Sequence, residues 1–263
     1  MTQREQESHD IPEDHPRYQS LKYRHRIIEG MKDLVVAEAG LIAHGRGECF
    51  DYILGEKTNK SAEEAIRAAT AALLLAKRPV ISVNGNVAAL VPEKLVKLSE
   101  ALNAPLEINL FYRKEGRIEA IENVLRQAGA VHLLGTDESE MVELDNLSSN
   151  RRKVDPEGIK KGDVIMVPLE DGDRTEKLKE LNRTVIAIDL NPLSRTSLWA
   201  DITIVDNVIR VLPKMTKAAQ KLKSYDNKKL EQIVEKFDNK KNIKQSLDLM
   251  IEYLKDQKKH VFD

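Results

Sequence analysis

Three carboxylates surround a single glycine in the segment EDGDRT, at residues 170–175. Glycine lets a backbone approach a ligand closely and expose its N–H groups. The acidic side chains offer the oxygen ligands that Mg²⁺ prefers, and Arg174 at a helix start can meet a phosphate. The segment therefore predicts a site for phosphate or magnesium. The alternative is an ordinary helix start, in which Asp173 caps the helix and Arg174 is solvated.

Short polar residues follow almost every predicted strand. In an open parallel α/β sheet, ligands bind beyond the carboxyl ends of the strands. Any one of these residues is also a usual choice for a turn or a helix cap. Their coincidence at one edge of a sheet favours a polar ligand site. The residues are Asn84-Gly85-Asn86, Asn109, Gly135-Thr136-Asp137, the segment 170–175, Asp189-Leu190-Asn191 and Asp206-Asn207.

Three arginines lie near glycine or serine, outside the strongest helical patterns: Arg24, Arg46 and Arg195. Arginine binds phosphate or carboxylate through two donors at once, although lone arginines are usually surface residues. His44 lies between glycines in the segment 40–47, which we interpret as a glycine-bearing loop. It is therefore a better candidate for the site than the histidines near the termini.

Several common catalytic motifs are absent. The sequence has no GxGxxG after a strand, no GxxxxGK[ST], no GxSxG and no HExxH. Its single cysteine excludes an intramolecular disulfide and a cysteine-based zinc cluster. A classical dinucleotide fingerprint, a P-loop and a serine-hydrolase elbow are thereby excluded, so the predicted site is of a less common kind.

Apolar strands alternate with amphipathic helices along the chain. We expect helices at 17–37, 61–77, 92–103, 118–128 and 173–181, and further helices after 214. Strands are predicted at 80–83, 106–110, 130–134, 163–169, 184–190 and 202–205, and a polar loop at 137–160.

This alternation predicts a Rossmann-like, three-layer α/β fold with a mainly parallel sheet. The core is expected at 60–212. An N-terminal helix and the glycine-bearing loop, at 1–59, should pack on it, and C-terminal helices should occupy 213–263, giving one compact domain overall.

The composition excludes some functions. Lys and Arg number 42 against 43 acidic residues, and aromatic residues make up 4%, so neither a basic face nor a base-stacking surface is expected. The apolar runs are too short to span a bilayer, and no signal-peptide pattern opens the chain. We therefore expect a cytoplasmic protein that binds neither nucleic acid nor membrane.

Six long sequence blocks are distinctive when taken together. They are HPRYxSLxYR (15–24), AGLIAHGRGExFDYxxGE (39–56), PVISVNGNVAALVP (79–92), VPLEDGDRTE (167–176), IDLNPLSR (188–195) and ADITIVDN (200–207). These blocks resemble one enzyme family, archaeal phosphopantothenate synthetase, also called 4-phosphopantoate–β-alanine ligase. The resemblance runs from about residue 12 to beyond 255, while 137–160 and the lysine-rich C-terminal part match only loosely.

The resemblance implies a homodimeric ligase of coenzyme A biosynthesis that depends on ATP and Mg²⁺. It would join 4-phosphopantoate to β-alanine through an acyl-adenylate, giving 4′-phosphopantothenate, AMP and pyrophosphate. The ATP site carried over by motif comprises Arg24, Arg46, Asp171, Gly172, Asp173, Arg174, Thr175, Asp189, Leu190, Asn191 and Asn207.

Within this family we expect Arg46, His44 and Asp173 to act in catalysis. A second anion pocket must hold the 4-phosphate of the substrate, and we expect His44, Asn84 and Asn86 to form it. The ligands of Mg²⁺ and the base for the β-alanine amine are left open.

Two rival functions are compatible with the residues alone. The first is a small-molecule kinase that phosphorylates a hydroxy acid or carboxylate and releases ADP. The second is a non-catalytic domain that binds ATP and leaves it intact. The products formed from ATP distinguish all three functions.

Overall fold

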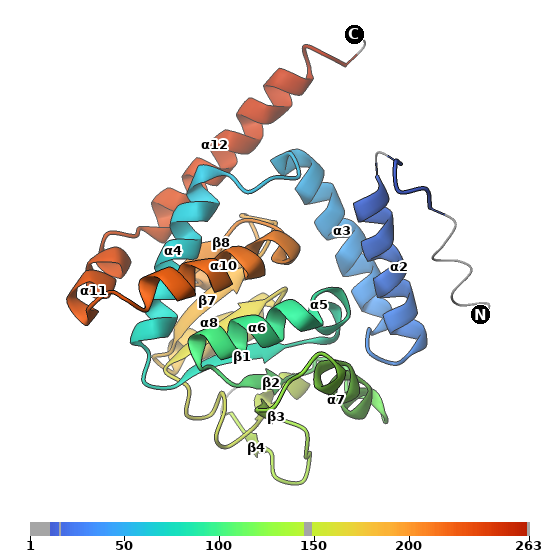
Figure 1. Cartoon of the computed structure of the whole chain (residues 1–263), viewed down its shortest axis with the longest axis vertical. Helices are drawn as coiled ribbons and strands as arrows, with labels where there is room; N and C mark the ends of the chain where they lie inside the picture. The colour runs from blue at the N-terminus through green and yellow to red at the C-terminus, as the bar shows by residue number, and fades with distance from the viewer. Residues whose placement is uncertain (1–10, 16, 145–148, 262–263) are drawn as a thin grey trace.

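A six-stranded, fully parallel sheet forms the centre of the molecule (Figure 1). It is seen in a computed structural model that describes residues 11–15, 17–144 and 149–261. In sheet order the strands are β3 (Leu133–Leu134), β2 (Leu106–Ile108), β1 (Pro79–Val83), β6 (Val164–Pro168), β7 (Thr184–Ile188) and β8 (Ile202–Ile204). The prediction of a Rossmann-like α/β fold is confirmed.

Successive strand residues face opposite cores, so both faces of the sheet are covered. Ile81 and Met166 pack in one core, while Val80 and Ile165 pack in the other. Residues of α4 (Lys60–Leu75), α5 (Gly85–Leu90), α6 (Pro92–Leu102), α7 (Arg117–Gln127) and α10 (Val208–Leu222) belong to the first core. Leu178 of α8 (Gly172–Glu180) belongs to the second. The short helix α9 (Arg195–Trp199) follows β7.

The predicted glycine-bearing loop at 40–47 is wrong, because this segment lies inside α3 (Glu38–Leu54). The preceding helix, α2 (Tyr18–Lys32), also ends earlier than expected, and Leu34 then takes a left-handed φ of 62°. Glycine lowers helix stability by about 1 kcal/mol per residue, but tertiary packing outweighs that cost. A Cβ on Gly40 would lie 2.3 Å from Asn86 Oδ1, so the glycine permits close packing of α3 on α5.

Two glycines of α3 offer a matched test of this packing. Gly40→Ala is expected to lower the free energy of unfolding by about 1–3 kcal/mol, because the new methyl group overlaps Asn86 and Val36. A Cβ on Gly45 would meet no described atom within 4 Å beyond its own stretch of helix, so Gly45→Ala should raise stability by about 0.5–1 kcal/mol. Urea unfolding of both variants measures the difference. Equal effects would show that close approach at Gly40 is not needed.

The predicted polar loop at 137–160 contains a small antiparallel pair. Its strands are β4 (Val142–Glu143) and β5 (Lys153–Val154), with a 3₁₀ turn, η1 (Asn150–Arg152), before the second. Glu107 of β2 holds the chain after β5 against the sheet, since its carboxylate accepts hydrogen bonds from the N–H groups of Asp155 (3.1 Å) and Ile159 (2.6 Å). The end of the segment that was predicted to be a polar loop is therefore anchored to the core.

Burial raises the pKa of Glu107 from 4.5 to about 7. Because the folded protein binds this proton more tightly than the unfolded chain, the stabilisation present below pH 4.5 is lost as the pH rises through about 7. Loss of this proton is expected to lower the free energy of unfolding by up to about 3 kcal/mol as the pH is raised from 4 to 8. Urea unfolding across that range should show a shallower pH dependence for Glu107→Gln. An unchanged slope would contradict the prediction.

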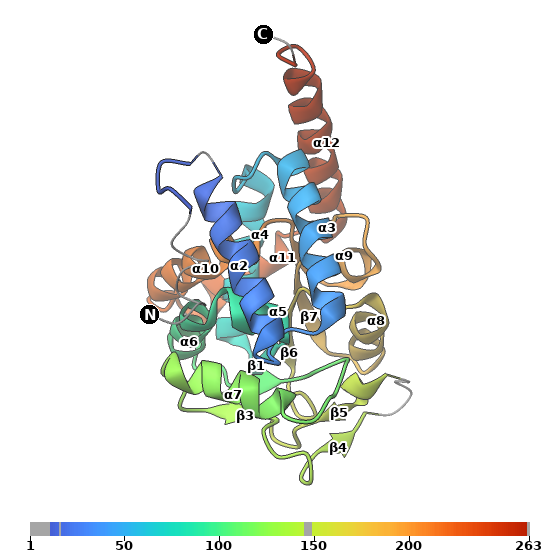
Figure 2. The same ribbon diagram turned by 90° about the vertical axis from the view of Figure 1, so that its right-hand side faces the viewer.

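The chain ends in helices, as predicted. After α10 come α11 (Asn227–Glu235) and α12 (Asn239–Gln257). The start of α12 packs beside α4 and β8, and its far end projects from the body of the molecule (Figures 1 and 2). None of the helices in the described part of the chain is long and apolar enough to cross a membrane. The division at 59/60 and 212/213 stays a prediction; residue 212 itself lies within α10.

Candidate active site

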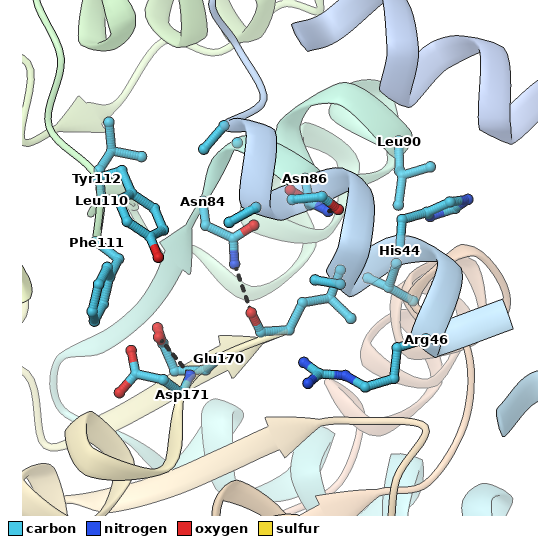
Figure 3. A pocket seen from close by; sticks show the side chains of 18 of the residues that line it. His44, Arg46, Asn84, Asn86, Leu90, Leu110, Phe111, Tyr112, Glu170 and Asp171 are labelled. Atoms are coloured by element: carbon cyan, nitrogen blue, oxygen red, sulfur yellow. Dashed lines mark hydrogen bonds between the residues drawn. The ribbon is translucent and has the colours of Figure 1, made fainter. Parts of the chain in front are cut away.

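A cavity of about 410 Å³ opens at the carboxyl ends of the strands (Figure 3). Its lining comes from the chain after β1, β2, β6, β7 and β8, and from α3, which lies over the strand ends. The chain builds β1, β2 and β3 outward in one direction and then returns to add β6, β7 and β8 on the other side of β1. The strand order therefore reverses between β1 and β6, and the cavity lies at this topological switch point, where α/β proteins bind ligands. The cavity opens at the sheet edge where the sequence predicts the site, and its assignment as that site stays a prediction.

Asn84 joins the two halves of the sheet at the switch point. Its Nδ2 donates to the carbonyl oxygens of Pro168 (2.9 Å) and Leu169 (3.1 Å), while its Oδ1 caps α5. Asn86 donates from Nδ2 to the carbonyl of Gly40 at 2.8 Å, which fixes α3 against α5. Both asparagines line the cavity; the two side-chain N–H groups of Asn84 and one of those of Asn86 already serve the fold.

A buried charge cluster forms the floor of the cavity. Glu170 accepts hydrogen bonds from both Arg151 and Arg174, and Arg151 Nε lies 3.0 Å from Asp171 Oδ2. Burial raises the pKa of Glu170, although the two arginines oppose this shift. Burial also acts to raise the pKa of Asp171, but Arg151 and the Arg174 N–H outweigh it, so the pKa lies below its usual value. Two carboxylates and two guanidinium groups thus balance each other.

Only the first two residues of the segment 170–175 line the cavity. Asp171, rather than Asp173, caps α8, accepting from the Arg174 N–H at 3.0 Å. The alternative with a capping Asp173 and a solvated Arg174 is therefore wrong: Asp173 is exposed and pairs with Arg195, whereas the Arg174 side chain is fully buried. Thr175 donates its hydroxyl to the Asp171 carbonyl at 3.1 Å, and Gly172 packs on Arg195.

Arg46 is the cation most available to a ligand. It extends from α3 into the cavity toward Asp171 (Figure 3), and it makes no hydrogen bond or ion pair with any residue that the structure describes. Unpaired guanidinium groups facing a cavity suit phosphate or carboxylate oxygens. The helical setting of Arg46 differs from the predicted loop, but it keeps the side chain over the strand ends.

His44 lies close to Arg46 on α3 and also lines the cavity, with its ring turned away from Asp171 (Figure 3). Burial lowers its pKa, and the nearby Glu48 only partly opposes this, so the imidazole is neutral near pH 7. Its Nε2 atom is buried without a hydrogen-bond partner in the described structure. Such a nitrogen is available to hydrogen-bond or to accept a proton.

Arg24 is linked to the cavity through Glu48, which lines it. Its Nε donates to the two Glu48 carboxylate oxygens at 3.0 and 2.8 Å, and Glu48 lines the cavity while Arg24 does not. This pairing raises the pKa of Arg24 and keeps it charged. Arg24 therefore stands just behind the wall that carries Arg46.

The segments after β7 and β8 complete the wall. Leu190 and Asn207 line the cavity, whereas Asp189 lies behind it and holds the turn, accepting from the Asn191 N–H (2.9 Å) and the Ser194 hydroxyl. Burial raises the pKa of Asp189. Asn207 caps α10 and donates from Nδ2 to Asp51 at 2.7 Å, which links this wall to α3.

The cavity residues that were not predicted include Phe111, Tyr112, Arg117 and Arg151. Arg117 is buried and donates to the carbonyl oxygens of Tyr112, Leu34 and Val35, so it fastens the loop after β2 to the turn before α3. The prediction covered only the residues directly after each predicted strand. Extending it three residues beyond Asn109 would have included Phe111 and Tyr112. Arg151 lies in a polar run with no distinguishing pattern.

The described residues do not form a ready-made magnesium site. No group of three or more His, Cys, Asp or Glu side chains among them is arranged to hold a metal ion. The two cavity carboxylates on the floor, Glu170 and Asp171, are already paired with arginines. A resident divalent cation does not fit this donor set.

A parallel Rossmann-like sheet with an arginine-bearing cavity at its switch point defines an α/β protein that binds anionic ligands. The family model described as phosphopantothenate/pantothenate synthetase matches residues 61–253. The chain is 56% identical over 234 residues to the 4-phosphopantoate--beta-alanine ligase of Thermococcus onnurineus, covering 89% of each chain. Identity to the ligase of the same name from Methanosarcina mazei is 50% over 246 residues, covering 94% of this chain and 96% of the relative. The chain belongs to the phosphopantothenate/pantothenate synthetase family.

Proposed function

We propose that this protein is an ATP-dependent ligase that condenses 4-phosphopantoate with β-alanine to 4′-phosphopantothenate and releases AMP and pyrophosphate. The main support is the cavity at the switch point, into which the unpaired Arg46 guanidinium points. In addition, relatives of this chain in the same family are named for this ligation. A carboxylate must be activated before an amine can displace its oxygen, and transfer of the adenylyl group from ATP to the carboxylate is one way to activate it.

The reaction then takes two steps, adenylate formation and amide formation. A carboxylate oxygen of 4-phosphopantoate attacks the α-phosphorus of ATP, forming the acyl-adenylate as the bond to pyrophosphate breaks. The neutral amine of β-alanine next attacks the acyl carbon, and AMP leaves. Arg46 lowers the repulsion between the two anions in the first step by neutralising developing charge. His44, neutral near pH 7, is our candidate to accept the proton that the amine releases in the second.

The ATP site is proposed on the wall formed by α3 and the chain after β7 and β8. Arg46, Leu190 and Asn207 lie in the cavity lining there, and Arg24 stands behind it. Asp189 and Asn191 shape the adjoining turn, and the segment 171–175 begins α8 on the neighbouring side. Because the described carboxylates do not form a metal site, we propose that Mg²⁺ enters bound to the triphosphate, as part of the substrate.

We also propose a homodimer. Supporting it are apolar side chains that α2 and α3 leave exposed, among them Ile28 and Ile42, the latter 73% exposed. Exposed apolar groups on neighbouring helices favour association when they form one patch. Sedimentation velocity at several concentrations distinguishes a stable dimer from a monomer.

A product assay tests the proposed ligation. Purified protein is incubated with ATP, Mg²⁺, 4-phosphopantoate and β-alanine, and the nucleotide products are separated. We expect AMP and pyrophosphate only when 4-phosphopantoate is present, and 4′-phosphopantothenate only when β-alanine is added. Release of ADP would instead support the kinase, or an acyl-phosphate mechanism. Binding of ATP without turnover would support the non-catalytic alternative.

A further inference from the structure

A second arginine, Arg151, lines the cavity from a different part of the chain. It belongs to η1, between β4 and β5, and its side chain is 8% exposed. Asn109, at the exit of β2, donates from Nδ2 to the Lys153 carbonyl at 2.9 Å, and Asn150 donates to the Phe111 carbonyl at 3.2 Å. The chain after β2 thus holds the backbone around Arg151 in place, although this residue lies in the polar segment 137–160.

The charge cluster contains more donors than acceptors. Arg151 Nη1 and Arg174 Nη1 donate to the same oxygen, Glu170 Oε2. Arg174 Nε and Nη2 are buried without a partner, and Arg151 Nη2 makes no hydrogen bond in the part of the chain that the structure describes. Arg151 lines the cavity and Arg174 does not, so Arg151 Nη2 is the unused donor of this cluster that an anion in the cavity would meet.

The proposed substrate needs two separate anion sites. In 4-phosphopantoate the carboxylate and the phosphate lie at opposite ends of a four-carbon chain that carries two methyl groups. The carboxylate must meet the α-phosphorus of ATP, which we place near Arg46, so the phosphate must lie elsewhere in the cavity. Leu110 and Leu169 provide apolar lining for the methyl groups. Asn84 already donates both of its side-chain N–H groups to the fold, and Asn86, which donates to the Gly40 carbonyl, carries no positive charge to offset a phosphate dianion.

We propose that Arg151 binds the 4-phosphate of the substrate, a phosphate monoester dianion, and that Glu170 and Arg174 position its guanidinium group. Asp171 then gives up its contact with Arg151 Nε, while its other carboxylate oxygen continues to cap α8. This inference rests on the proposed function and adds the residue that distinguishes 4-phosphopantoate from unphosphorylated pantoate.

The test compares Arg151→Gln with Arg152→Gln. Arg152 is the next residue, is 44% exposed and pairs with Glu143 on the surface, so it is a matched control. The readouts are KM for 4-phosphopantoate and for ATP, and the inhibition constant of pantoate against 4-phosphopantoate. Arg151→Gln should raise KM for 4-phosphopantoate by about 10- to 100-fold. The pantoate constant and KM for ATP should stay within about threefold of wild type, because neither ligand uses this contact.

The outcomes separate a binding role from a structural one. If Arg151 only supports the fold, the constants for pantoate and 4-phosphopantoate will worsen together, and the inference is overturned. If Arg151→Gln does not fold, Arg151→Lys keeps the charge but loses the two-donor geometry, and it should reduce the preference for 4-phosphopantoate by about fivefold or more. An unchanged preference in that variant also overturns the inference. A wild-type protein that forms no 4′-phosphopantothenate refutes the proposed function itself, whatever the variants do.

Discussion

Replacing Arg46 with alanine is expected to lower kcat/KM for ligation by about 100- to 1,000-fold while leaving the fold intact. The guanidinium points into the cavity and makes no hydrogen bond or ion pair within the described structure, so its removal costs the fold little beyond an electrostatic attraction to Asp189. What is lost is the positive charge that offsets two approaching anions. Initial rates with 4-phosphopantoate, ATP and β-alanine measure the first effect, and thermal unfolding measures the second.

A control for Arg46→Ala is Arg67→Ala. Arg67 is an exposed arginine of α4 that lines a separate groove beside α11. Its replacement should leave both the rate and the melting temperature unchanged. Near-normal ligation in Arg46→Ala would remove this residue from the site and would favour an ATP position elsewhere along the strand ends.

The largest effect on stability is expected for Glu170→Gln. The Glu170 side chain is 1% exposed and balances the charges of Arg151 and Arg174, so the neutral variant leaves two buried guanidinium groups short of a counter-charge. Breaking a buried ion pair from one side costs about 3–5 kcal/mol. For a chain of this length the melting temperature should fall by roughly 10 °C. Differential scanning calorimetry measures the shift.

A surface pair provides the comparison for Glu170. Glu176 lies 2.6 Å from Arg195, whose side chain is 61% exposed. Exposed ion pairs contribute about 0–1 kcal/mol, so Glu176→Gln should change the melting temperature by only a few degrees. Equal losses in the two variants would mean that the buried cluster does not stabilise the fold.

The sheet and the position of the cavity were predictable because strand patterns are local. Continuous apolar runs marked β1, β6 and β7 to within a residue or two, and the polar residues after them gave the edge where the cavity opens. Local patterns do not carry the packing of distant elements. The glycines of α3 indicate a loop when considered alone, whereas the structure shows that Gly40 permits a helix to approach Asn86 closely.

The same limit applies to individual site residues. Asp171 and Asp173 are chemically equivalent in the sequence, but the helix begins at Gly172, so one caps it in the cavity wall and the other faces solvent. Arg151 and Arg152 are neighbours in a charged run, and one is buried while the other is exposed. Which of two identical side chains enters a cavity depends on backbone direction at that point, and no pattern in the run encodes it.

The cavity wall is gathered from residues as far apart in the chain as Ala37 and Val208. During synthesis the ribosome therefore releases most of the polypeptide before the last wall segment, after β8, is available. A ligand that contacts the whole wall cannot stabilise a chain that lacks this last segment, since ligands stabilise only the states that bind them. The hydrogen bond from Asn207 to Asp51 joins this last segment to α3, so the complete wall exists only in a chain that has formed this long-range contact.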